Sequence, residues 1–189
     1  MNKILTISSE MFKAFAISAF AYIFLFYINA LLTSELIFGL GVNWIYLPAG
    51  LRLFLTLIFG LPGAMGIALA SFLISYLGEL PHDFTLCLGV GLVSGLAPYL
   101  ARAFVISNTD LQTDLGNLSL QKLLSCIFIY ALLSASLHQL WYATTGLENT
   151  GTFNHFLVMF VGDVFGSILL IAVVKYGLDI LKKTRRIEH

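Results

Sequence analysis

The sequence predicts an all-α, polytopic membrane protein, a bundle of about six transmembrane helices that forms one integral membrane domain over residues 1–189. Composition supports this prediction, because 59% of the residues are hydrophobic, only 11% are charged, and the mean hydropathy is +0.92. Soluble domains carry about 25% charged residues. A water-soluble fold keeps polar groups outside and rarely buries charge, so lipid is expected to be the solvent for most of this chain.

Uncharged runs separated by helix breakers set the expected helices. A spanning helix needs roughly 20 apolar residues, so six spans leave room only for short connections. The first apolar run is longer than a signal-peptide core and no clear cleavage site follows it, so we interpret it as a span. The expected spans are residues 14–32, 48–59, 62–77, 86–107, 120–144 and 154–181.

The second and third spans allow two interpretations. Residues 53–78 carry no charge and could form one long helix. Pro62, flanked by Gly60 and Gly63, instead favours two short helices in a hairpin, because proline interrupts a helix interior. The preceding residues 40–48 are either re-entrant or lie along the membrane surface.

Lys and Arg occur at the termini and beside the connection between the fourth and fifth expected spans, and they are absent from three other connections. Under the positive-inside rule, connections rich in Lys and Arg are cytoplasmic, which predicts that both termini are cytoplasmic. The basic residues expected inside are Lys3, Lys13, Arg102, Lys122, Lys182, Lys183, Arg185 and Arg186. The opposite connections contain no Lys or Arg and hold Glu35, Glu79, His82, Asp83 and Glu148.

Ionisable residues inside spans mark candidate functional positions, because each costs a few kcal/mol to insert. Arg52 lies in the second span, His138 in the fifth and Asp163 in the sixth, while His155 lies at the start of the sixth. At about 1.5 Å of rise per residue, this topology puts all four in the outer half of the bilayer. They could therefore line one cavity that opens to the outside.

Arg52 and Asp163 are the expected partners. A planar guanidinium suits a carboxylate, so one interpretation is a structural ion pair that joins the second span to the sixth. The other is a ligand site in which Arg52 binds an anionic group and Asp163 holds Arg52 in place. His138 is either proton-sensitive or a histidine hydrogen-bonded inside the bundle.

Aromatic residues near the expected outer boundary are typical either of an interfacial belt or of a pocket lining. The possible pocket comprises Trp44, Tyr46, Pro48, His138, Trp141 and His155. The sequence contains no catalytic, nucleotide-binding or metal-binding motif, so we expect no enzyme activity, cofactor or metal. Zero net charge makes nucleic acid an unsuitable partner.

Two stretches resemble a known family. They are WIYLPAGLR at residues 44–52, continuing to FGLPGA at residues 59–64, and VGDVFGSIL at residues 161–169. Together they are similar to the bacterial membrane-associated sensor domain that precedes histidine kinase and diguanylate cyclase modules. The resemblance implies a multi-helix sensory unit in the bacterial inner membrane. Family members usually have about eight spans and an output domain, so this chain is expected to act through a partner protein.

The resulting functional hypothesis is a stand-alone sensor-like or ligand-binding membrane module. One alternative is the substrate-binding subunit of a vitamin-type transporter, which is also a six-helix protein with an outward pocket. That class shows an AxxxA docking pattern, whereas this chain has Ala14-x-x-x-Ser18. The other alternative is an assembly subunit of a membrane complex. The expected partners are the lipid bilayer and a kinase, a cyclase or transporter subunits.

Overall fold

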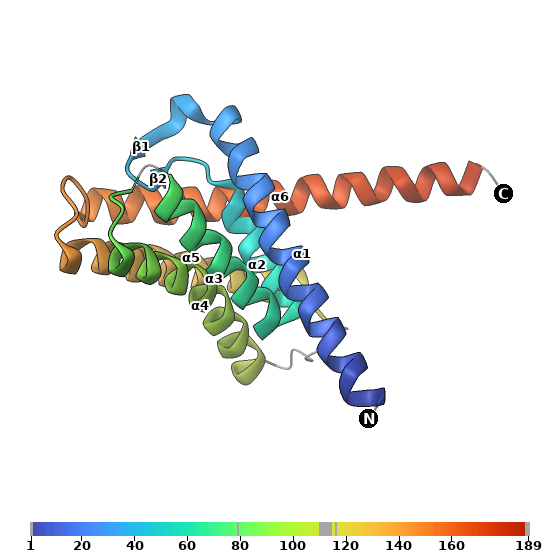
Figure 1. Cartoon of the computed structure of the whole chain (residues 1–189). Helices are drawn as coiled ribbons and strands as arrows, with labels where there is room; N and C mark the ends of the chain where they lie inside the picture. The colour runs from blue at the N-terminus through green and yellow to red at the C-terminus, as the bar shows by residue number, and fades with distance from the viewer. Residues whose placement is uncertain (1, 79, 110–114, 116, 188–189) are drawn as a thin grey trace.

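The computed structural model describes residues 2–78, 80–109, 115 and 117–187. Helices dominate this part of the chain, and one small hairpin interrupts them (Figure 1). The elements are α1 (Asn2–Leu32), the 3-10 turn η1 (Ser34–Leu36), β1 (Ile37–Gly39), β2 (Val42–Asn43), α2 (Leu47–Phe59), α3 (Leu61–Leu77), α4 (Phe84–Asn108), α5 (Leu120–Thr145) and α6 (Phe153–Ile187).

Four helices are long and apolar enough to cross a membrane. In the described part of the chain these are Ser8–Leu32 within α1, Phe84–Asn108, Leu120–Thr145 and Phe153–Gly177 within α6. The shorter apolar helices α2 and α3 have 13 and 17 residues. An all-helical chain with membrane-compatible helices is therefore confirmed.

A sharp turn at Gly60 separates α2 from α3. Gly60 has φ +62° and ψ −134°, a backbone conformation that glycine adopts without the steric cost of a Cβ. Pro62 follows in the first turn of α3, where its missing N–H costs no helical hydrogen bond. The structure therefore decides between the two interpretations of residues 48–77 in favour of two helices.

The segment before α2 forms a β-hairpin, which the sequence analysis did not predict. β1 and β2 pair antiparallel, with Ile37 opposite Asn43, and the turn contains Gly41 at φ +67°. The hairpin lies over the ends of two helices, because Gly39 is next to His155 of α6 and Gly41 is next to Tyr142 of α5. It connects α1 to α2 and sets where α2 begins.

Helix α2 occupies the middle of the bundle, in contact with all five other helices. Its residues Ala49, Leu53 and Leu57 form one core with small and aromatic side chains of α4 and α5. The outer faces of the longer helices expose large apolar side chains such as Phe20 and Phe128. This arrangement, with apolar side chains outside and a central short helix, is suited to a lipid surround.

The connections gather at two ends of the bundle. The hairpin, Leu80 and Leu147 lie at one end, where Leu80 and Leu147 pack in the same cluster with Tyr142. The Gly60 turn lies at the other end, beside Arg102 of α4. In Figure 1 the N-terminal part of α1 and the long C-terminal part of α6 both point away from the hairpin.

Candidate functional site

Arg52 is held by two tyrosines in the interior of the bundle. It is 4% exposed, and its Nε donates to the Tyr22 hydroxyl of α1 at 2.9 Å. Its Nη2 donates to the same hydroxyl and to the Tyr46 hydroxyl at 3.3 Å, and the two hydroxyls are 3.0 Å apart. The guanidinium carbon also lies 5.0 Å and 5.2 Å from the two ring centroids. The tyrosines therefore solvate the charge by hydrogen bonds and by cation–π contact.

Asp163 is equally buried, at 1% exposure, on the face of α6 that packs against α2. It does not form the expected direct ion pair, because no Arg52 nitrogen comes within 4.0 Å of an Asp163 oxygen. The two charges still interact electrostatically, and Ser134 of α5 lies beside the carboxylate. The two predicted residues are therefore both buried and interact electrostatically, but the direct partners of Arg52 are tyrosines.

Several buried polar atoms make no hydrogen bond of good geometry, although the Tyr130 hydroxyl lies near Arg52 and the Ser134 hydroxyl near Asp163. Among the described residues they come from α1, α2, α5 and α6. They are Ser18 Oγ, Arg52 Nη1, Thr56 Oγ1, Tyr130 OH, Ser134 Oγ, Asp163 Oδ2 and Ser167 Oγ. Native proteins leave few buried polar groups unpaired, so these atoms need an explanation. Both members of the charged pair are included, which makes this region the candidate functional site.

His138 belongs to a second polar chain that crosses α3, α4 and α5. Its Nδ1 is 2.8 Å from the Ser134 carbonyl oxygen, and its Nε2 is 3.3 Å from Ser94 Oγ. Ser94 Oγ is in turn 2.8 Å from Ser71 Oγ. With 1% exposure and a partner for each ring nitrogen, His138 matches the interpretation of a hydrogen-bonded histidine inside the bundle.

The two stretches that carry the family resemblance pack against each other. A Cβ at Gly162 would lie 2.0 Å from the Asn43 carbonyl oxygen, and one at Gly166 would lie 2.0 Å from the Tyr46 carbonyl oxygen. The Tyr46 N–H also donates to the Gly162 carbonyl at 3.1 Å. The small residues of α6 thus let the segment before α2 approach the helix backbone. This contact presents Asp163 to the same interior as Arg52.

The other candidate pocket residues are spread over the hairpin end. Pro48 is fully buried at the start of α2, whereas Trp44 is 46% exposed. Trp141 donates from its indole nitrogen to the Leu86 carbonyl at 3.0 Å. His155 stacks edge-on against Phe38 of the hairpin. Of the proposed pocket residues, Tyr46 therefore contacts Arg52 directly, while Trp141 and His155 serve helix and hairpin packing.

Tyr130 and Ser134 of α5 were missed at the sequence level, whereas His138 on the same helix was among the predicted residues. Tyr130, Ser134 and His138 follow one another at intervals of four on α5, so they share one helix face. This periodicity of polar groups inside an apolar span was available as a signal. Asn29 of α1 is a different case, because its side chain accepts a hydrogen bond from Leu47 N at 3.0 Å and so caps α2. No local sequence pattern predicts this hydrogen bond between Leu47 and Asn29.

Two surface cavities lie away from this centre. One, of about 330 Å³, is lined by residues of α2, α5, α6 and the α4–α5 connection. The other, of about 510 Å³, lies between α5 and α6 and includes Phe128 and Ile168. Neither includes Arg52 or Asp163, and both of these side chains are buried.

Comparison with known proteins identifies no relative. No protein-family model, curated protein or solved structure matches the chain. The resemblance to the membrane-associated sensor domain therefore stays a prediction.

Proposed function

We propose that this chain is a sensor-like, ligand-binding membrane module that acts through a partner protein. The ligand site is the buried centre around Arg52 and Asp163, and the host membrane is the bacterial inner membrane. The observation that carries this proposal is that one guanidinium nitrogen of Arg52 and one carboxylate oxygen of Asp163 are buried and make no hydrogen bond of good geometry. A polar ligand with both an acceptor and a donor would complement these two groups.

In the proposed topology all six helices cross the membrane and both termini are cytoplasmic. At 1.5 Å per residue, the 13 residues of α2 extend about 20 Å, less than the roughly 30 Å hydrocarbon core. Other helices surround α2, so it does not need to match the lipid thickness along its own length. The charge distribution supports the orientation, because Arg102 lies beside the Gly60 turn, whereas Glu35, Asp83 and Glu148 belong to connections at the hairpin end; Glu79, Asp110 and Asp114 lie outside the described residues.

Ligand occupancy is the first test. The protein is extracted from its native membrane in detergent, and native mass spectrometry compares wild type with Arg52→Gln and Arg52→Lys. We expect a small-molecule adduct on wild type and at least about tenfold less on Arg52→Gln, which corresponds to the roughly 1.4 kcal/mol of one charge-assisted hydrogen bond. Lys122→Gln on α5 removes a cation elsewhere and serves as the matched control.

Two results would contradict the proposed site. One is a wild-type protein whose mass always equals that of the bare chain. The other is an adduct that all four proteins retain equally, because the ligand would then bind without Arg52. Arg52→Lys keeps the positive charge but lacks the planar guanidinium. If Arg52→Gln does not fold, the adduct on Arg52→Lys is compared with that on wild type instead.

Partner identity is the second test. Affinity purification of the chain from its own membrane is expected to recover a kinase or cyclase. An ATPase would favour the transporter alternative instead, and a large stable assembly without either would favour the assembly-subunit alternative.

A further inference from the structure

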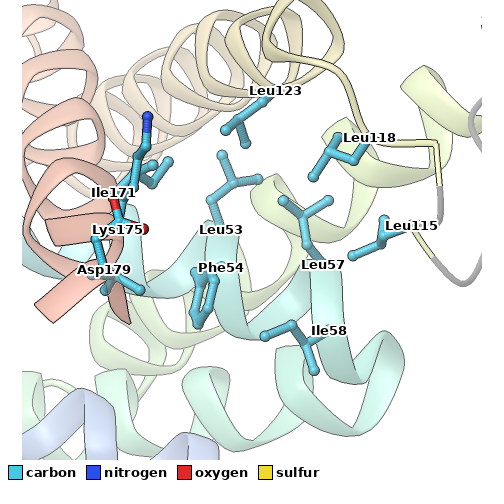
Figure 2. Close-up of a pocket in the computed structure, with 11 residues that line it drawn as sticks. Leu53, Phe54, Leu57, Ile58, Leu115, Leu118, Leu123, Ile171, Lys175 and Asp179 are labelled. Carbon is cyan, nitrogen blue, oxygen red and sulfur yellow. The ribbon is translucent and has the colours of Figure 1, made fainter. Parts of the chain in front are cut away.

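An amphiphilic cavity lies at the opposite end of α2 from the hairpin (Figure 2). Its walls are apolar, and Leu53, Phe54, Leu57 and Ile58 of α2 form one side. Leu115, Leu118 and Leu123 close the cavity from the α4–α5 connection and α5, and Ile171 and Val174 from α6. Its volume of about 330 Å³ is at the lower end of the range for small-molecule sites. A narrow apolar cavity of this kind suits a hydrocarbon chain.

Two opposite charges lie at the α6 side of the same cavity. Among the residues that the structure describes, Lys175 and Asp179 are the ionisable ones that line it, and both are exposed. They are one helical turn apart, so their side chains share a face of α6. They form no ion pair with each other in the structure, and a Lys that precedes its acidic partner is the less favourable order for such a pair in a helix. Both charges are therefore available to a ligand at the rim.

The order of the two charges along α6 matches a membrane phospholipid. Lys175 lies 22 residues after Phe153, about 33 Å along the helix at 1.5 Å per residue, close to the thickness of the hydrocarbon core. Asp179 lies about 6 Å further out by the same rise. A phospholipid whose chain enters the cavity would therefore present its phosphate at Lys175. The headgroup beyond the phosphate would then reach Asp179, where a protonated amine is the complementary group.

We propose that this cavity is a specific site for a zwitterionic phospholipid with a primary amine headgroup, phosphatidylethanolamine. One acyl chain occupies the apolar walls, Lys175 binds the phosphate, and Asp179 binds the ammonium. The site is separate from the buried centre around Arg52, so it goes beyond the proposed ligand function. Its location in the inner leaflet follows from the proposed topology, but binding itself does not depend on that orientation.

The test measures lipid affinity in detergent by native mass spectrometry. The protein is titrated with phosphatidylethanolamine, phosphatidylglycerol and phosphatidylcholine that carry identical acyl chains, and the Kd of the first bound lipid is determined. Wild type is expected to bind phosphatidylethanolamine most tightly. The glycerol headgroup lacks the amine, and the quaternary ammonium of choline has no N–H to donate to Asp179.

The variants separate the two headgroup contacts. Lys175→Ala is expected to weaken phosphatidylethanolamine and phosphatidylglycerol alike, by about fivefold, the upper range for one exposed ion pair. Asp179→Asn is expected to weaken phosphatidylethanolamine by a similar factor and leave phosphatidylglycerol unchanged or tighter. Ile58→Trp fills the cavity and is expected to weaken all three lipids, because it competes with the acyl chain.

Lys13→Ala is the matched control. Lys13 is exposed, pairs with Glu10 on α1 and lies outside the cavity lining. Lys175 and Asp179 are also exposed, so their variants are expected to elute and unfold like wild type. The proposal is overturned if wild type does not distinguish phosphatidylethanolamine from phosphatidylglycerol, or if Lys175→Ala and Lys13→Ala have equal lipid affinities.

Discussion

At the scale of single residues, the burial of Arg52 is the main energetic problem that this bundle solves. An unpaired charge in a low-dielectric interior is strongly unfavourable. The tyrosine hydroxyls of Tyr22 and Tyr46 accept hydrogen bonds from the guanidinium, and their ring faces add cation–π attraction. Arg52 Nη1 and Asp163 Oδ2 make no hydrogen bond of good geometry. A donor and an acceptor are therefore left at the centre.

Removing the Tyr22 hydroxyl tests this arrangement. Tyr22→Phe deletes the acceptor of two Arg52 N–H groups, so we expect destabilisation of about 1–3 kcal/mol, the cost of leaving a buried donor unsatisfied. Tyr27→Phe makes the same chemical change at a 57% exposed position of α1 and is expected to have little effect. Denaturant unfolding in mild detergent measures both, and equal stabilities of the two variants would contradict the role of Tyr22.

Exchanging the two charges distinguishes a simple ion pair from the tyrosine-held arrangement. Arg52→Asp and Asp163→Arg are each expected to destabilise by about 3–5 kcal/mol, as for a broken buried charge network. The double exchange is expected not to restore stability, because an arginine at position 163 would lack the Tyr22 hydroxyl that Arg52 uses. Recovery to near wild-type stability in the same unfolding assay would instead show that the two charges act as a plain pair.

At the scale of elements, close backbone contacts set the arrangement of the helices. Gly162 and Gly166 bring α6 against the residues before α2, Gly91 and Gly95 bring α4 against α3, and Gly66 brings α3 against α1. In each case a carbonyl oxygen of the neighbouring segment occupies the space that a Cβ would need. These contacts are tight because small residues permit them, and helix association in lipid depends on such packing.

A pair of glycine substitutions on one helix tests this packing. Gly162→Ala would put a Cβ 2.0 Å from the Asn43 carbonyl oxygen, so we expect destabilisation of about 1–3 kcal/mol from overpacking. Gly177→Ala on the same helix has nothing within 4 Å and is expected to be neutral or to stabilise by up to about 1 kcal/mol through helix propensity. If thermal unfolding in detergent ranks the two variants equally, α6 does not depend on this close approach.

At the scale of the whole molecule, the fold separates an end with the hairpin from an end with the Gly60 turn and the projecting part of α6 (Figure 1). The buried centre lies near the start of α2, toward the hairpin end, because Tyr46 and Arg52 both belong to this region. The amphiphilic cavity lies toward the other end, with Lys175 and Asp179. The two candidate sites thus use neighbouring stretches of the same central helix, with Arg52 in the buried centre and Leu53, Leu57 and Ile58 in the cavity.

Cysteine labelling tests the orientation of these ends in the membrane. Cys87 and Cys126 are buried and are first replaced by Ser. In that background Glu148→Cys is expected to react with a membrane-impermeant maleimide added to intact cells, and Lys183→Cys only after the cells are opened. Both positions are exposed in the structure. Reaction of Lys183→Cys in intact cells would overturn the proposal of cytoplasmic termini.

The predictability of this protein from sequence differs between its elements. The long uncharged runs anticipated α4, α5 and α6 to within a few residues at their starts, because insertion into lipid requires continuous apolar segments. Gly60 and Pro62 similarly predicted the α2–α3 turn, because glycine adopts positive φ without steric cost and proline interrupts a helix interior. The hairpin of β1 and β2 was not predicted, because its strands are only three and two residues long. Strands of this length are too short to show a period-two pattern.

The sequence by itself determined the solvent and the buried charges. The apolar composition predicts a lipid surround, and the insertion cost of ionisable groups singled out Arg52 and Asp163, since both properties are local to a segment of the chain. Only the tertiary structure decided the partners. Arg52 binds a tyrosine 30 residues earlier in the chain and stays outside direct contact with Asp163, because such contacts depend on how each helix is rotated and how closely its neighbours approach. Those quantities arise from packing between segments, so no single segment contains them.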